Sequence, residues 1–130
     1  MRRALALPGC LVLLAAVSCS KSEGNVVSMV PGRRFSPRTM TVPAGTTITF
    51  RNQADDAHTV TAYEAVLPPA ADYFSSGGFS SEAEARDGLS DALIKKGDAV
   101  EWTLAEPGAY RYFCIPHEAD GMTGTIVVER

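Results

Sequence analysis

The sequence predicts an all-β fold, a sandwich of short antiparallel strands. Short segments rich in β-branched and aromatic residues recur through most of the chain. Within several of them apolar and polar residues alternate, which is typical of a strand with one buried and one solvated face. Proline and glycine turn signals separate these segments, and helix signals are confined to one region. This pattern favours two sheets packed around one core.

The alternation is clearest in two segments. Ile48 and Phe50 alternate with threonines in the first, and Val100 and Trp102 alternate with polar residues in the second. Each segment therefore has one apolar face that a strand can bury. In chain order, the predicted strands are 26–30, 39–42, 46–51, 58–62, 99–104, 109–114 and 123–129, with turns at 43–45 and 106–108.

Residues 63–97 interrupt the strand pattern. Within them, 81–96 favours helix, with Ser81 as a candidate N-cap and acidic residues in the first turn. Gly88 weakens the middle of this segment, which predicts one or two short helices in place of one long helix. The insertion is interpreted either as an excursion that packs over one sheet edge or as a partner-docking surface. The docking surface would contain Tyr73, Phe74 and Phe79.

The N-terminal segment has the character of an export signal. Two arginines precede a mostly apolar run at 5–17 that is too short to span a bilayer comfortably. The run that ends at Cys19 resembles a bacterial lipobox, in which this cysteine becomes the lipidated first residue; simple secretion is the alternative. We therefore expect a signal peptide at 1–18, a polar tether at 19–24 and one domain at 25–130.

Composition excludes some classes of partner. Removal of residues 1–18 leaves 112 residues, an ordinary size for one domain. It also leaves 10 basic residues against 15 acidic ones, a net charge of −5 without a basic stripe. This balance argues against a nucleic-acid partner. If Cys19 is lipidated, Cys114 has no cysteine with which to form an internal disulfide.

The residues that carry chemistry form one pattern of metal ligands. Cys114, His117 and Met122 form a Cys-x2-His-x4-Met motif, and His58 lies at the head of a separate strand-like segment. One thiolate, two neutral imidazoles and one thioether are the ligand set of a type 1 (blue) copper site. Soft sulfur favours Cu(I) and imidazole suits both oxidation states, so such a site moves little on electron transfer. The sequence therefore predicts one copper ion bound by these four residues.

Other uses of these residues fit the pattern less well. Cys114 and His117 have the residue types of a nucleophile and its base, but residues three apart at a strand end rarely meet in that geometry without a shared ion. Structural zinc sites prefer four strong ligands, and Met122 is a poor fourth ligand. We therefore expect a protein without enzymatic activity.

Neighbouring residues are expected to tune such a site. Asn52 and Thr59 are candidates for hydrogen bonds to the ligands, and Thr59 follows His58 directly. His117 lies in a short loop beside Ile115 and is the candidate port for electrons. A shallow apolar patch at this point would suit the small, weak interfaces of redox encounters.

The chain resembles the cupredoxins, specifically the plastocyanin-like group that includes halocyanins and pseudoazurins. The resemblance implies a Greek-key sandwich, one copper ion, a monomer and one-electron transfer between larger redox proteins. By position, His58, Cys114, His117 and Met122 take the ligand roles. Plastocyanins have Asn after the upstream His where this chain has Thr59, which affects the expected hydrogen bond to the cysteine sulfur. The matching segments are 35–37, 42–47, Asn52, 58–60, 107–108 and 110–124, and the insertion resembles that of halocyanin-like members.

The expected function is that of a single-electron carrier at the cell envelope, on the periplasmic or equivalent face of the membrane. A lipid on Cys19 would hold it there, a membrane oxidoreductase would supply the electron, and a terminal oxidase or reductase would accept it. Two alternatives stay open: a copper storage or delivery module, and a metal-free adhesion or scaffold sandwich.

Overall fold

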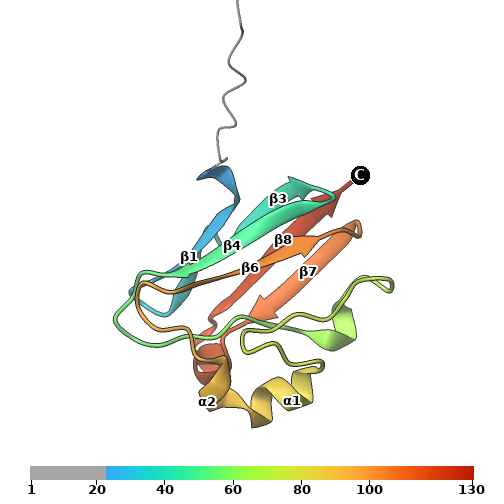
Figure 1. Cartoon of the computed structure of the whole chain (residues 1–130). Helices are drawn as coiled ribbons and strands as arrows, with labels where there is room; N and C mark the ends of the chain where they lie inside the picture. Colours follow the sequence, from blue (N-terminus) through green and yellow to red (C-terminus); the bar gives the residue numbers. More distant parts are fainter. Residues whose placement is uncertain (1–22) are drawn as a thin grey trace, which may run out of the picture.

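The computed structural model describes residues 23–130. The predicted export signal, Cys19 and most of the predicted tether lie outside the described residues. Within the described part, two four-stranded sheets face each other, and no helix there has the length and apolar character needed to cross a membrane (Figure 1). The sheets have the orders β2-β1-β4-β6 and β3-β8-β7-β5, and the strands are β1 (Val26–Val30), β2 (Arg34–Ser36), β3 (Thr39–Pro43), β4 (Thr46–Asn52), β5 (Thr61–Ala62), β6 (Ala99–Leu104), β7 (Gly108–Phe113) and β8 (Thr123–Glu129).

The all-β sandwich is confirmed, but the expectation of purely antiparallel sheets is wrong. β1 runs parallel to β4, and β3 runs parallel to β8. Alternation in a sequence reports which face of a strand is buried, and it does not report the direction of the neighbouring strand. Direction is set here by connections that pass from one sheet to the other and return, so that strands distant in sequence become neighbours.

Two strand predictions also differ from the structure. The short β2 was not predicted, and the predicted strand 58–62 is reduced to β5. His58 instead forms an isolated antiparallel bridge with Ile94, and the carbonyl of Val60 accepts a hydrogen bond from the amide of Ser76. The insertion therefore takes backbone hydrogen bonds that a longer strand would have used within the sheet.

The core fills the space between the sheets with alternating side chains. In β8 every second residue is buried, as the period of a strand requires. Tyr112 of β7 lies at the centre, where its ring meets the edges of Phe35 and Phe50 at 4.8 and 5.2 Å between centroids. Gly124 of β8 faces this ring, and a Cβ there would lie 2.3 Å from it. Only glycine therefore lets β8 pass this close to Tyr112.

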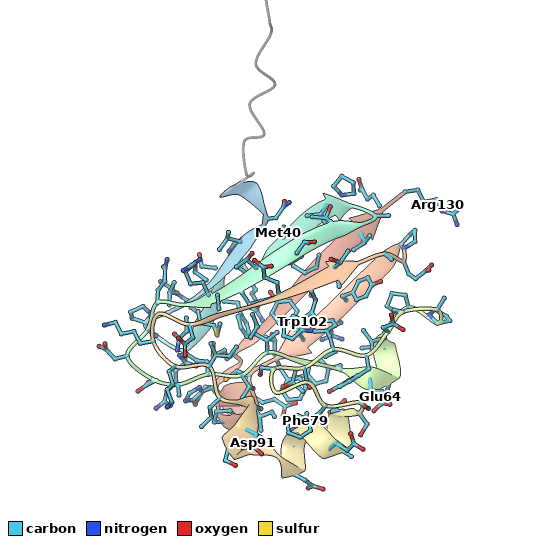
Figure 2. The ribbon with its side chains drawn as sticks, viewed as in Figure 1. Met40, Glu64, Phe79, Asp91, Trp102 and Arg130 are labelled. Carbon is cyan, nitrogen blue, oxygen red and sulfur yellow. The ribbon has the colours of Figure 1, made fainter. Side chains whose placement is uncertain are left out.

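The insertion contains one 3-10 turn and two short helices: η2 (Glu64–Val66), α1 (Glu82–Asp87) and α2 (Leu89–Ala92). The Ser81 side chain accepts a hydrogen bond from the Glu84 amide, and the helical segment breaks at Gly88, as predicted. The Phe79 ring lies against Gly88, where a Cβ would approach it to 2.2 Å. Figure 2 shows Phe79 among these helices.

The insertion covers a sheet edge, which was the first of its two interpretations. Thr61 of the edge strand β5 forms a bridge with Ser75, and the Ala62 amide donates to the carbonyl of Phe74. Phe74 is buried with its ring 5.1 Å from that of Trp102. A docking surface that includes Phe74 is therefore wrong, because its side chain belongs to the core.

Candidate metal centre

Three of the four predicted ligands meet at one end of the sandwich. Cys114 directly follows β7, and His117 lies in the 3-10 turn η3 (Ile115–Asp120) that connects β7 to β8. His58 comes from the connection between β4 and β5, where two backbone hydrogen bonds with Ile94, of 3.2 and 2.7 Å, fix its position. In Figure 1 the turn η3 and α2 lie at the same end of the molecule, so the insertion and the predicted ligands share this end.

The donor atoms face a common point. Nδ1 of His58 and Nδ1 of His117 lie 3.1 Å apart, and Sγ of Cys114 lies 3.7 and 3.5 Å from them respectively. A trigonal ion with bonds of about 2.0–2.3 Å to imidazole and thiolate would hold its donors about 3.5–3.8 Å apart. The observed triangle is close to that size, so these three side chains fit a trigonal copper site.

Met122 belongs to the same loop and is fully buried. Its carbonyl accepts a hydrogen bond of 3.0 Å from the Cys114 amide, and its own amide donates to the carbonyl of His117 at 3.2 Å. Gly121, with φ of 80°, supplies the left-handed residue that ends η3 just before it. The backbone thus places Met122 next to both loop ligands, and its role as the axial ligand remains a prediction.

Burial tunes the donors before any metal arrives. It lowers the pKa of His58, which favours the neutral imidazole that a metal requires. It raises the pKa of Cys114, and hydrogen bonds from Thr59 oppose this effect. Metal binding must therefore displace the thiol proton. Among the described residues, buried Nε2 of His58 has no hydrogen-bond partner, so only its Nδ1 is engaged in this cluster.

Thr59 fulfils the role expected of the residue after the upstream histidine. Its amide donates a hydrogen bond of 3.3 Å to Sγ of Cys114, and its hydroxyl oxygen accepts one of 2.8 Å from the Ile115 amide. The bond to sulfur comes from the backbone, and for this reason it survives the replacement of Asn by Thr at this position.

Asn52 acts on the site indirectly. Its side-chain amide donates to the carbonyls of Asp56 and Ile94 at 2.8 and 2.9 Å, and its oxygen accepts from the Ala54 amide at 2.9 Å. It does not bond to a ligand ring. It fastens the loop that carries His58 to the segment with which His58 forms its bridge.

Sequence reasoning missed a polar network beside the site. Glu118 directly follows His117, and its carboxylate binds Arg86 and Tyr63 from the insertion. The Arg86 guanidinium holds the pKa of Glu118 below its usual value, whereas burial, with Glu118 nearby, raises the pKa of Tyr63 to about 12. These residues are far apart in sequence and follow no motif, so the only available signal was the charge of Glu118 next to a candidate ligand.

The fold and this cluster of two imidazoles and one thiol define the class of the protein as a metal-binding β-sandwich of the cupredoxin type. Residues 23–129 match the family described as copper binding proteins, plastocyanin/azurin family. The chain belongs to this family, whose members bind one copper ion.

Plastocyanins are among its relatives. Plastocyanin B, chloroplastic, from Populus nigra is 35% identical over 123 residues, which cover 91% of this chain and 68% of that protein. Plastocyanin A/B from Petroselinum crispum is 32% identical over 114 residues, 88% of this chain and 99% of that protein. The match to the chloroplastic plastocyanin of Chlamydomonas reinhardtii, 33% identical, spans 73% of this chain but only 58% of that protein.

Solved structures agree with the fold. A reduced Cu(I) form of an amicyanin mutant has a TM-score of 0.59 at 26% identity, and the match covers 82% of this chain and 83% of the amicyanin. A purple cupredoxin from Nitrosopumilus maritimus has a TM-score of 0.56 at 21% identity, with 80% of this chain and 98% of that one covered.

Proposed function

We propose that this protein is a type 1 copper protein that carries single electrons between redox partners and is not itself an enzyme. His58, Cys114, His117 and Met122 would bind the ion. The observation that supports the proposal most is the triangle of two Nδ1 atoms and one Sγ, with sides of 3.1–3.7 Å. Copper bound there would supply a one-electron couple between Cu(I) and Cu(II).

The described side chains suit this use. Cys114, His58 and Met122 are buried, so solvent has little access to their donor atoms. His117 is partly exposed, and the adjacent Pro116 is exposed. The outer edge of the His117 ring is therefore the proposed point of electron entry and exit, and a small interface at this point would let partners exchange quickly.

The partners and the location are proposed from the sequence. A membrane oxidoreductase would donate the electron, and a terminal oxidase or reductase would accept it. A lipid on Cys19 would hold the monomeric domain at the extracytoplasmic face of the membrane. The electron carriers among the relatives support the type of partner only, not its identity.

The ligand assignment is tested by colour. The purified protein loaded with Cu(II) is expected to be intensely blue, and Cys114→Ser is expected to abolish the colour while the far-ultraviolet circular dichroism stays that of a sandwich. Blue colour retained in Cys114→Ser would refute the assignment.

A carrier and a copper-delivery module differ in their exchange behaviour. The carrier is expected to show a reversible one-electron wave in voltammetry and slow release of Cu(I) to a chelator. Rapid surrender of Cu(I), with no reversible wave, would favour delivery over electron transfer.

A further inference from the structure

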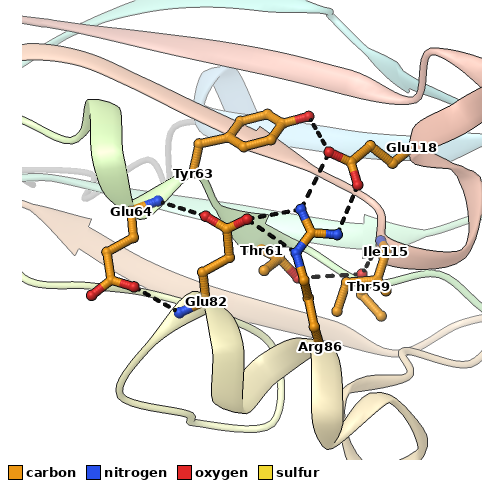
Figure 3. Close-up of polar contacts among 8 residues, drawn as sticks. All are labelled: Thr59, Thr61, Tyr63, Glu64, Glu82, Arg86, Ile115 and Glu118. Atoms are coloured by element: carbon orange, nitrogen blue, oxygen red, sulfur yellow. Dashed lines mark hydrogen bonds and ion pairs between the residues drawn. The ribbon is translucent and has the colours of Figure 1, made fainter.

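The residue that follows His117 is held by two side chains of the insertion. The Arg86 guanidinium of α1 donates to both carboxylate oxygens of Glu118, at 2.8 and 3.3 Å, and the Tyr63 hydroxyl donates to one of them at 2.9 Å (Figure 3). Glu118 lies in η3 between the predicted ligands His117 and Met122. The insertion is thus bonded directly to the loop that supplies ligands.

Arg86 is itself held in place. Its Nε and Nη2 donate to one carboxylate oxygen of Glu82 at 3.0 and 2.7 Å. The other oxygen of Glu82 accepts from the Glu64 amide, and the Glu64 carboxylate accepts from the Glu82 amide in return, at 3.0 and 3.1 Å. Figure 3 shows the guanidinium between the two carboxylates of Glu82 and Glu118. Its planar fork is therefore oriented before it meets Glu118.

Arg86 also contacts the residue that precedes Cys114. Its guanidinium carbon lies 4.3 Å from the centre of the Phe113 ring. The Tyr63 ring stacks on the same Phe113 ring, with centroids 4.3 Å apart and an interplanar angle of 28°. The insertion thus binds the ligand segment at both ends, at Phe113 before the cysteine and at Glu118 after the histidine.

One exposed ion pair contributes little, but these contacts act together. The side chains of Arg86, Glu82 and Glu118 are 38%, 22% and 32% exposed, so each pair is only partly screened by water. Two carboxylates and one aromatic face converge on Arg86, and the Tyr63 hydroxyl adds a hydrogen bond to one of these carboxylates, that of Glu118. Movement of η3 away from the sandwich would break several of these contacts at once.

We infer that Arg86 is a positioning residue for the metal-binding loop, and that the insertion acts as a clamp on residues 113–118. In this arrangement the clamp holds His117 at the site before metal arrives and slows the opening of the loop that metal release requires. The effect of the clamp on copper release rests on the proposed function, whereas its effect on loop opening does not.

The primary test uses hydrogen exchange in the metal-free protein. The amides of His117, Gly121 and Met122 donate to backbone carbonyls inside the loop, so their exchange reports loop opening. Arg86→Met keeps an apolar side chain over Phe113 but loses the guanidinium group. It is expected to accelerate exchange of these amides about tenfold. Core amides of β4 are expected to exchange as before.

Three further variants make the test specific. Glu118→Gln removes the charge from the other partner and is expected to match Arg86→Met, while the double variant is expected to add nothing further because both changes break one interaction. Arg86→Lys keeps the charge without the fork and is expected to recover part of the protection. Arg51→Met is the control, since Arg51 is exposed on β4 and makes no ion pair within residues 23–130.

A second measurement separates the clamp from the carrier proposal. In copper-loaded protein, Arg86→Met is expected to release Cu(I) to a chelator about tenfold faster than Arg51→Met. If the unmodified protein binds no copper, the carrier proposal fails and exchange alone decides the clamp. The clamp is overturned if the loop amides exchange at the same rate in Arg86→Met as in Arg51→Met. It is also overturned if the effects of Arg86→Met and Glu118→Gln on the exchange rate add in the double variant.

Discussion

The body of the sandwich and its metal-binding end are stabilised in different ways. The body is packed with apolar side chains from facing strands, and its inner residues are almost all aliphatic or aromatic. The metal-binding end is where the buried polar side chains gather. Those in the described part of the chain run from the last residue of β4 into the insertion: Asn52, His58, Thr59, Thr61, Ser75 and Ser76.

This difference teaches where each region is sensitive. Apolar packing is non-directional, so the body depends on volume and on which face is buried. Buried polar groups depend on specific partners, and removal of one partner leaves another group without its hydrogen bond. Substitutions should therefore affect global stability most in the body and local geometry most at the metal-binding end.

The largest effect on stability is expected from truncation in the body. Phe50→Ala removes a fully buried ring that meets the edges of Trp102 and Tyr112. We expect the free energy of unfolding to fall by about 3–5 kcal/mol, because the cavity cannot fully collapse. Urea unfolding of the metal-free protein measures it, with Arg51→Ala on the exposed face of the same strand as the control. A loss below about 1 kcal/mol would contradict the packing described above.

A smaller but more local effect is expected from Asn52→Ala. It leaves the carbonyls of Asp56 and Ile94 without their side-chain donors. We expect the free energy of unfolding to fall by about 2–3 kcal/mol, and copper affinity to fall as well because the loop with His58 is loosened. Urea unfolding and a copper titration measure the two effects. Gln53→Ala, at the exposed neighbouring residue, is the control. Equal copper affinity in the two variants would show that Asn52 does not affect the metal site.

Thr59→Val removes one hydroxyl next to the thiol, which accepts hydrogen bonds from the Ile115 amide and the Thr61 hydroxyl at 2.8 and 3.4 Å. It keeps the shape and the Thr59 amide that donates to Cys114, but it leaves the Ile115 amide without the hydroxyl oxygen that accepts from it. We expect a loss of about 1–2 kcal/mol in the free energy of unfolding of the metal-free protein. Thr59→Ser retains the hydroxyl and should lose less than Thr59→Val; the opposite order would show that packing of the methyl group matters more.

The smallest effect is expected at the exposed pair Lys96–Asp55. The hydrogen bond and charge of Lys96 lower the pKa of Asp55 from its ordinary 3.8, so the pair stabilises the fold above that value and loses its effect as the pH falls through the lowered one. Lys96→Met should lower Tm by at most about 2 °C at neutral pH, since such pairs contribute little. Thermal unfolding at pH 7 and near pH 2 should show the difference shrinking in acid; a difference that grows in acid would reverse the sign argued here.

The contrast between the two regions also explains what the sequence could predict. The strands β1, β6 and β8 were predicted with their observed limits because β-branched composition and alternation depend on the residues of the strand alone. The helix start at Ser81 and the break at Gly88 were also predicted from residues within the segment itself. Local chemistry determines these features.

Features that depend on distant partners were not predictable in this way. The parallel pairing of β1 with β4, and the bond between Arg86 and Glu118, join segments whose sequences carry no mark of one another. The candidate ligands are an exception, since a rare combination of residue types and spacing indicated them before any geometry was known. The structure then brings His58, Cys114 and His117 together, with Met122 in the same loop.

The close contact between Gly124 and Tyr112 limits how the loop between β7 and β8 can be redesigned or can diverge. The ladder of β7 and β8 pairs Tyr112 with Gly124 and closes at Phe113 and Thr123, which leaves nine residues outside it. A shorter or longer loop can be grafted between β7 and β8 only if glycine is kept at the position of Gly124, opposite the Tyr112 ring. The pair of strands β7 and β8 therefore provides a fixed base on which loops of different length can be exchanged without altering the sandwich.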